Sequence, residues 1–161
     1  MPMTISTDGI EELGEMLAKL EGRAQDVASG ALFEGAGIVG DAFTAATNRI
    51  RTAPFKYAFG GNQRLPSPEE KAALLGKSGI AHFDKSGDEV NTLIGISGSA
   101  GYADVAGRPK AVRLIARSIN SGTSFMQKQP VYRKAASQSS GRAKDAIVSK
   151  AEQMFNEIIG G

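Results

Sequence analysis

The residues that could carry out acid–base or nucleophilic chemistry are few and scattered. His82 is the chain's one histidine, and there is no cysteine. A serine hydrolase site would have to use His82, yet no Gly-x-Ser-x-Gly turn is present. The serine- and glycine-rich stretch 96–101 lacks that spacing, and it lacks the Gly-Lys-Ser/Thr ending of a phosphate-binding loop. We therefore predict that the protein is not an enzyme and that His82 is an ordinary strand residue.

Two pairs of adjacent acids could in principle hold a cation. Glu69-Glu70 lies at a predicted helix start, and Asp88-Glu89 lies at a predicted hairpin turn. Helix capping and solubility explain both positions, although a divalent cation at such a pair stays open as a minor alternative. The sequence predicts no cofactor and no metal site.

Charge is unevenly distributed along the chain, although the net charge is only +2. Residues 1–104 carry 9 basic and 14 acidic side chains, whereas residues 105–161 carry 10 basic and 3 acidic ones. Within this half, the segment 108–144 contains nine lysines and arginines and no acid. Such a segment is a solvated basic face, or it meets the acidic half of a neighbouring copy in head-to-tail contacts. A third alternative is a nucleic-acid groove with Phe125 and Tyr132 between the basic residues, although no known module has this pattern.

The composition indicates a single domain made in the cytoplasm. The chain has 161 residues, of which 41% are hydrophobic and 22% charged, which is ordinary for one globular domain. Without cysteine there is no disulfide framework, which favours cytosolic synthesis. The start of the chain lacks the basic and apolar regions of a signal peptide, and no stretch approaches the ~18 apolar residues of a membrane-spanning helix.

The N-terminal third has helical patterns. Asp8 as N-cap, with Glu11 three residues later, begins a helix that ends near Gly22. A longer helix is predicted over residues 24–51, although each of its four glycines costs about 1 kcal/mol relative to alanine. These glycines are Gly30, Gly35, Gly37 and Gly40. Close packing against a sheet or a neighbouring subunit would offset the cost; alternatively, the helix breaks there.

The rest of the chain alternates short elements with loops. The aromatic-rich segment 55–66 is predicted to be an extended loop or arm, which packs as an edge strand or docks on a partner. The expected elements after it are a helix over 67–76, a β-hairpin over 80–97, a second extended loop over 98–109, a helix over 110–121 that Gly122 ends, and a last amphipathic helix over 135–159, with a possible restart after Gly141. Helices at both ends around a small antiparallel sheet make the predicted fold class α+β.

One block of residues resembles a known family. Leu114-Ile-Ala-Arg-Ser-Ile-Asn-Ser-Gly-Thr-Ser-Phe125, followed by Pro130-Val-Tyr-Arg-Lys-Ala135, resembles the C-terminal signature of the tail-completion (minor tail component, neck) family of long-tailed bacteriophages. The two N-terminal helices, ending in Ala53-Pro54, are similar as well. Members of the family often have Pro-Phe where this chain has Pro130-Val131, and an Arg-Thr-Gly after the Ala-Pro that this chain lacks.

The resemblance implies a structural virion protein, with residues 1–161 as one tail-completion-like domain. Copies of the chain, six by the symmetry of the tail, would form a ring around the DNA channel at the head-proximal end of the tail. The expected partners are further copies, a tail terminator or tail tube protein, and a head-side connector or stopper, with DNA only passing through. The expected interface residues are Arg113, Arg117, Ser121, Gly122, Thr123, Ser124, Phe125, Pro130, Tyr132 and Arg133.

Two alternatives to this role stay open, namely a tail terminator ring protein and a nucleic-acid-binding protein that uses the basic segment 108–144. For the ring protein, the sequence suggests a mechanism. The glycine-rich loops and the basic arm would become ordered only on docking, so that the parts assemble in sequence.

Overall fold

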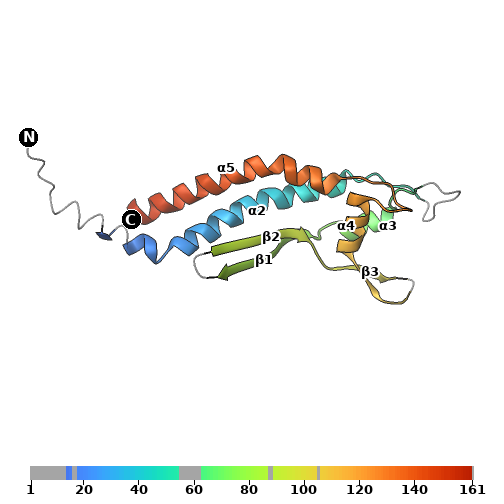
Figure 1. Ribbon diagram of the computed structural model, residues 1–161, viewed down its shortest axis with the longest axis horizontal. Helices are drawn as coiled ribbons and strands as arrows, with labels where there is room; N and C mark the ends of the chain where they lie inside the picture. The colour runs from blue at the N-terminus through green and yellow to red at the C-terminus, as the bar shows by residue number, and fades with distance from the viewer. Residues whose placement is uncertain (1–13, 16–17, 55–62, 87–88, 105, 161) are drawn as a thin grey trace, which may run out of the picture.

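Two long antiparallel helices are the largest elements of the fold (Figure 1). The computed structural model describes residues 14–15, 18–54, 63–86, 89–104 and 106–160. Its elements are α2 (Ala24–Asn48), α3 (Pro68–Leu74), β1 (Ser78–Ser86), β2 (Glu89–Ile96), β3 (Ser99–Ala103), β4 (Pro109–Ala111), α4 (Val112–Ser121) and α5 (Val131–Gly160). This arrangement confirms the predicted α+β class. Residues 18–21 are helical, whereas the predicted helix start at Asp8 lies outside the described residues.

The helices α2 and α5 approach closely because α2 has small residues where they meet. A Cβ atom on Gly35 would lie 2.5 Å from Cγ1 of Ile147, and one on Gly30 would lie 2.6 Å from the sulfur of Met154. The helix α2 is continuous from Ala24 to Asn48, so the alternative of a break at the glycines is wrong. The partner that Gly30 and Gly35 accommodate is the last helix of the same chain.

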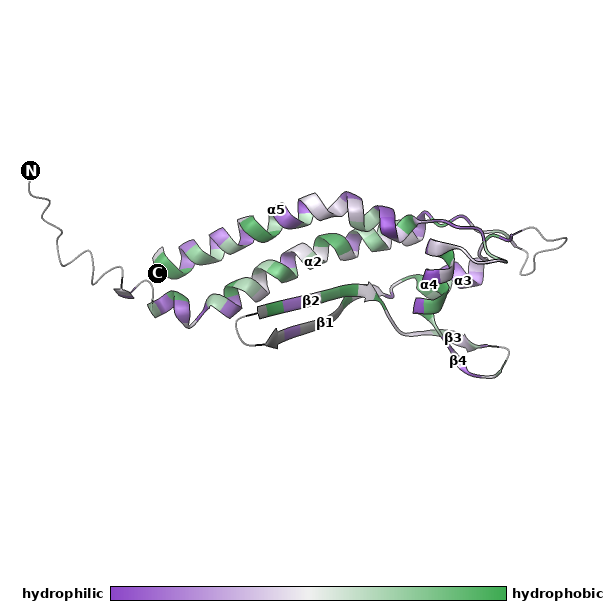
Figure 2. Ribbon diagram, in the orientation of Figure 1, coloured by the Kyte–Doolittle hydropathy of each residue, from purple (hydrophilic) through white to green (hydrophobic). Residues whose placement is uncertain are grey.

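The β1–β2 hairpin lies along α2, as Figures 1 and 2 show. The strands pair from Ser78 with Ile96 to Ser86 with Glu89, with a register shift between Ile80 and His82. The hydroxyls of Thr44 and Ser78 are 3.0 Å apart and tie the hairpin to the helix. The predicted hairpin over 80–97 is therefore confirmed, with His82 in β1 opposite Leu93.

We use the term junction end for the part of the molecule where α3, α4, β3 and β4 meet the end of α2 and the start of α5. The distal end is the opposite one, with the start of α2 and the end of α5. The main apolar core lies at the junction end. Its buried side chains are Ala46, Ile50, Leu74, Val112, Ile115, Ala116, Ile119, Met126 and Tyr132. Four elements thus bury their apolar faces together there, which stabilises the fold by removing those side chains from water.

The helix α3 begins as its sequence predicts. Ser67 accepts a hydrogen bond from the amide of Glu70, and the Glu70 carboxylate accepts one from the amide of Ser67, which makes a capping box. The Lys71 ammonium group donates to the carbonyl groups of Asn48 (2.7 Å) and Ile50 (3.0 Å). This lysine satisfies carbonyls at the end of α2, so α3 holds the end of the long helix in place.

Two predictions about the second half of the chain are corrected. The segment 98–109, predicted to be an extended loop, contains the strand β3 and leads into β4, with which β3 pairs antiparallel. Asp104 closes the turn, because its carboxylate accepts hydrogen bonds from the amides of Ala106 (2.9 Å) and Arg108 (3.0 Å). The last helix is one unbroken element that begins at Val131, so it does not restart after Gly141.

Candidate functional site

The Gly-Thr-Ser block forms a tight turn after α4. Gly122 has a φ of 75°, a left-handed conformation that glycine adopts readily, and it ends the helix as predicted. The Thr123 hydroxyl accepts hydrogen bonds from the amides of Phe125 (3.3 Å) and Met126 (3.0 Å). The Thr123 amide donates to the carbonyl of Met126 at 3.0 Å. Gly122 and Thr123, both predicted to contact a partner, therefore have structural roles within the chain.

The segment after this turn is fixed by two distant parts of the chain. Arg64 forms a parallel bridge with Met126, in which the Arg64 amide donates to the Phe125 carbonyl at 2.9 Å. The side chain of Gln129, 5% exposed, accepts from the Arg51 amide (2.9 Å) and donates to the Arg51 carbonyl (3.0 Å). This corrects the hypothesis that the basic arm becomes ordered only on docking, because Met126 and Gln129 are buried and the segment is hydrogen-bonded to Arg64 and Arg51.

The start of α5 is capped from the end of α4. The side-chain oxygen of Asn120 accepts a hydrogen bond from the Arg133 amide at 3.1 Å, which satisfies one free donor of the first turn. Pro130 stands just before the helix, and its carbonyl accepts from the Lys134 amide at 3.1 Å. Asn120 and Pro130 therefore set where the last helix begins.

Tyr132, predicted to contact a partner, is instead a core residue that is 7% exposed. Its hydroxyl lies 2.8 Å from that of Thr47, and its ring meets Phe43 edge-on with centroids 5.5 Å apart. Burial raises the pKa of the Tyr132 hydroxyl, and the hydrogen bond with Thr47 partly opposes the shift. The aromatic of the resembling block thus packs against α2 rather than facing outward.

A largely buried ion pair holds the junction end together. The Arg64 guanidinium donates two hydrogen bonds to the Glu70 carboxylate, at 2.7 and 2.8 Å, and the ammonium of Lys110 lies 3.9 Å from it. Burial by itself raises the pKa of Glu70, but hydrogen bonds from Arg64 and from the Ser67 amide, with the nearby positive charges, lower it below its usual value. Glu70, one of the acids considered for cation binding, therefore has protein cations as partners.

The exposed part of the predicted interface centres on one face of α4. Arg113 and Arg117 are four residues apart, so their exposed side chains share a face of the helix. Together with Ser121 they line a hollow of about 290 Å³, and Phe43 and Ile96 supply apolar surface within it. The structure thus brings three predicted residues to a surface that combines positive charge with apolar contact. Tyr132 reaches the same hollow from inside the core.

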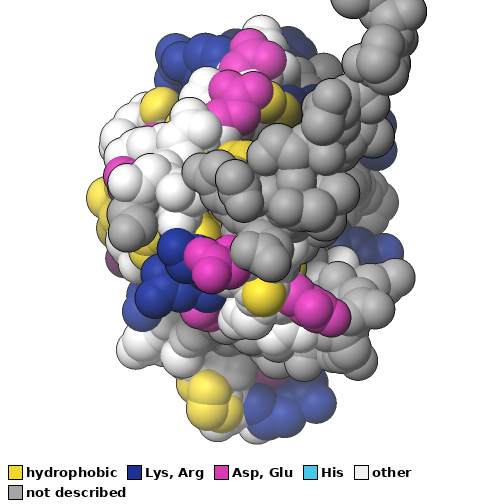
Figure 3. Space-filling view, turned by 90° about the vertical axis from the view of Figure 1, so that its left-hand side faces the viewer, with side chains coloured by type: hydrophobic (Ala, Val, Ile, Leu, Met, Phe, Trp, Pro, Cys, Tyr) yellow, Lys and Arg dark blue, Asp and Glu magenta, His cyan; other side chains and the backbone are white. Residues whose placement is uncertain are grey.

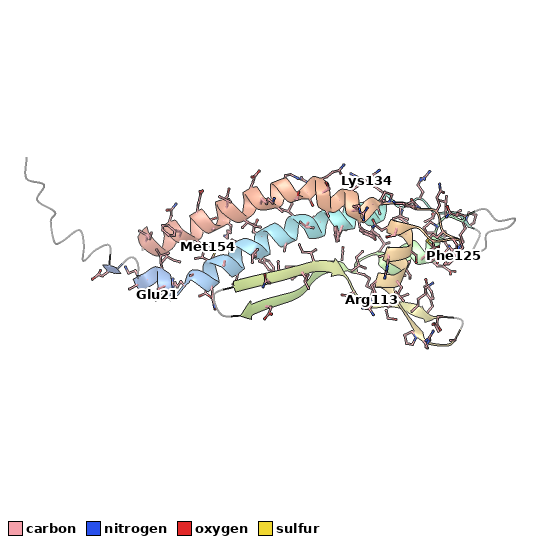
Figure 4. The ribbon with its side chains drawn as sticks, viewed as in Figure 1. Glu21, Arg113, Phe125, Lys134 and Met154 are labelled. Carbon is pink, nitrogen blue, oxygen red and sulfur yellow. The ribbon has the colours of Figure 1, made fainter. Side chains whose placement is uncertain are left out.

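The other predicted residues lie apart from this hollow. Phe125 is 52% exposed, and the Arg64 guanidinium carbon lies 6.0 Å from the centre of its ring. Ser124 and Arg133 are exposed as well. Figure 4 shows Arg113 and Phe125 at different places on the junction end, with Lys134 across the molecule from Arg113. The ten predicted residues therefore do not share one surface: Arg113, Arg117 and Ser121 lie on the basic face of α4, Phe125 is exposed elsewhere, Tyr132 is in the core, and the others lie in the turn after α4 or at the start of α5.

A basic groove lies on the other side of the junction end, between the end of α2 and the start of α5. It encloses about 350 Å³. Small side chains, among them Ala42, Ala45 and Ala135, form its floor, and Arg49, Lys134 and Arg142 line it. Lys134 and Arg142 belong to the basic segment that the sequence singled out, but nothing in the sequence placed Arg49 beside them. The signal could only have come from knowing that α2 and α5 are antiparallel.

The two ends of the molecule differ in charge. The described acids near the distal end are Glu15, Glu21, Asp26, Glu152 and Glu157, and the described bases there are Lys19, Arg23 and Lys150. Figure 3 looks onto this end and shows both acidic and basic side chains on it. At the junction end, Glu70 and Asp104 form ion pairs with Arg64 and Arg108, whereas most basic side chains point to solvent. The molecule is therefore electrically polarised along its long axis.

Neither a metal site nor a membrane span emerges from the described part of the chain. No group of three or more His, Asp or Glu side chains in the described ranges is arranged to hold a metal ion. Within the same ranges, no helix is long and apolar enough to cross a membrane. Comparison with known proteins gives no match to any family model, any curated protein or any solved structure.

Proposed function

We propose that this protein is a structural component of the neck of a long-tailed phage, where it completes the head-proximal end of the tail and joins it to the head connector. It works as a ring of identical copies around the DNA channel. The observation that carries the proposal is the charge polarity along the long axis, with a basic junction end and an acidic distal end. Opposite charges at opposite ends favour head-to-tail contacts, and such contacts give a closed ring when the rotation between copies closes.

The architecture supports this role in a second way. The residues that carry the resemblance to tail-completion proteins build the junction end, through the cap by Asn120, the turn at Gly122 and the buried Tyr132. They leave the basic face of α4 exposed beside Phe43 and Ile96. A surface that joins cations to apolar side chains suits a protein partner, because apolar contact supplies affinity and charge supplies orientation.

The experiment that tests the role is deletion of the gene from the phage genome that encodes it, followed by electron microscopy of the lysate. Filled heads beside finished but unjoined tails are expected. Normal infectious particles would overturn the proposal, and tails of uncontrolled length would make the protein a tail terminator instead.

A charge-reversal variant tests the α4 face within that role. Arg113→Glu with Arg117→Glu should leave the chain folded, since both side chains are exposed, and should fail to restore joined particles in the deletion phage. The matched control is Lys19→Glu with Arg23→Glu, an equal change of charge between exposed residues four apart at the distal end. The control should restore particles, because it adds to the acidic character of its own end.

A further inference from the structure

We propose that the basic groove between α2 and α5 binds the acidic N-terminal segment, residues 8–15, of a second copy of this chain. The inference rests on the proposed function for its biological setting, and it names the contact by which one copy holds the next. The groove is defined above by Arg49, Lys134 and Arg142 around a floor of small residues.

The three cations of the groove form no ion pair with the described acids, of which Asp41 on α2 and Asp145 on α5 come closest to them along the two helices. Arg142 and Arg49 are exposed, as is Lys134. Three cations around one groove repel one another and attract an anionic surface, so the groove favours an acidic occupant.

The N-terminal segment has the matching pattern. Its acids are Asp8, Glu11, Glu12 and Glu15, and no lysine or arginine occurs before Lys19. They recur at spacings of three, four and seven residues, so the helix that the sequence predicts would carry them in one stripe. The stripe spans about 10 Å, and Lys134 and Arg142, eight residues apart on α5, span about 12 Å. The two charged rows therefore have similar lengths.

In the helix that the sequence predicts, the segment would be too short to reach the groove of its own chain. From Ala24 to Ala45, which lines the groove, α2 rises about 32 Å at 1.5 Å per residue. A helix from Asp8 to Leu20 is about 18 Å long, so it falls short even if it folds back along α2. A helical occupant then comes from another copy. That copy's distal end would meet this copy's junction end, which is the head-to-tail arrangement that the charge polarity favours.

The floor of the groove suits a helix. Ala42, Ala45 and Ala135 have short side chains, which let the backbone of another helix approach closely. Ala46 and Ser139 on the same floor are 4% and 0% exposed, so they are already packed between α2 and α5 and keep the groove in shape. The groove is therefore held in shape before any partner arrives, which lowers the entropic cost of binding.

The test uses the full chain and its self-association, measured by sedimentation equilibrium. The groove variant is Arg49→Glu, Lys134→Glu and Arg142→Glu, and the segment variant is Asp8→Lys, Glu11→Lys, Glu12→Lys and Glu15→Lys. Each alone should weaken self-association by roughly 100-fold, because attraction becomes repulsion. Combined in one chain, they should restore association to within roughly tenfold of the wild type, since the opposite charges face each other again.

Three outcomes distinguish the possibilities. A control with Lys77→Glu, Lys128→Glu and Lys144→Glu, exposed residues that do not line the groove, changes the net charge equally and should keep self-association. Unchanged association of the groove variant would overturn the inference and leave a ring built on other contacts, so the proposed function would stand. Loss of binding to a DNA duplex, with self-association intact, would also overturn it and make the groove a nucleic-acid site.

A peptide keeps the test decisive where self-association of the wild type is weak. A fluorescent peptide of residues 6–21 should bind the wild-type chain and lose at least roughly tenfold in affinity for the groove variant. No binding of the peptide by the wild type, together with a monomer at all concentrations, would overturn the inference. The deletion phage would still decide the proposed function, because it reports on particles and not on this contact.

Discussion

The contacts that stabilise the distal end differ in kind from those that stabilise the junction end. At the distal end, α2 and α5 pack through glycines and alanines. Gly30 and Gly35, which have no side chain, leave room for Met154 and Ile147 of α5. At the junction end, the core is apolar, but a buried ion pair and specific hydrogen bonds decide which segment lies where. The distal end thus depends on close approach, and the junction end depends on matched polar partners.

This difference explains where the candidate functional surfaces lie. The polar partners at the junction end fix irregular segments, so the end presents a turn, an exposed aromatic and two basic surfaces in defined positions. The distal end is a plain pair of helices, on which the described acids outnumber the described bases. The proposed head-to-tail contact would place this shaped, basic end against the acidic end of the next copy.

Among the substitutions considered, removing the Glu70 charge should lower the free energy of unfolding the most, because it breaks the ion pair and hydrogen bonds at the junction end. Glu70→Gln leaves the partly buried Arg64 without its anion, and the loss of this charge-assisted pair should lower the free energy of unfolding by about 2–3 kcal/mol. Urea denaturation monitored by circular dichroism measures this change in the free energy of unfolding. Glu69→Gln, the exposed neighbour, should cost about 1 kcal/mol or less.

The same pair predicts a pH dependence. Because the pKa of Glu70 is lowered in the folded protein, its contribution is complete above the value of an unfolded glutamate, about 4.3. The contribution declines as the pH falls from there through the lower folded pKa. The difference in stability between wild type and Glu70→Gln should therefore shrink in acid, and a constant difference would mean that Glu70 acts through packing alone.

The sequence predicted the elements of this fold better than their contacts. The capping box at Ser67 and the stop at Gly122 depend on neighbouring residues, so local rules found them. The roles of Tyr132, Met126 and Gln129 depend on α2 and on the bridge to Arg64, far away in the sequence. From the sequence alone, the basic segment after Gly122 looks like an exposed arm, because its contacts with α2 and Arg64 come from distant parts of the chain. The basic face of α4 was predictable, because Arg113 and Arg117 are close in sequence.

Adding a side chain between α2 and α5 should lower the free energy of unfolding by an intermediate amount. This change tests the close packing of the two helices. A methyl group on Gly35 would meet Cγ1 of Ile147 at 2.5 Å and the backbone oxygen of Ala143 at 3.1 Å. Gly35→Ala should therefore lower the free energy of unfolding by about 1–2 kcal/mol, even after the gain in helix propensity. Ile147→Ala in the same chain should show favourable coupling with Gly35→Ala in a double-mutant cycle, and purely additive effects would mean that the helices do not meet as described.

Gly37→Ala should have the smallest effect on the free energy of unfolding, and it should stabilise the protein instead of destabilising it. A Cβ atom there meets nothing within 4 Å, and the residue is exposed, so Gly37→Ala adds helix propensity without a clash. The free energy of unfolding should rise by up to about 1 kcal/mol, measured as for Gly35→Ala. Two alanines introduced two residues apart in one helix would then act in opposite directions. That result would show that the cost at Gly35 comes from the face that meets α5, since propensity alone predicts a gain at both positions. A loss at Gly37 as large as that at Gly35 would contradict this account, because it would place a packed neighbour against a side of α2 that the structure leaves open.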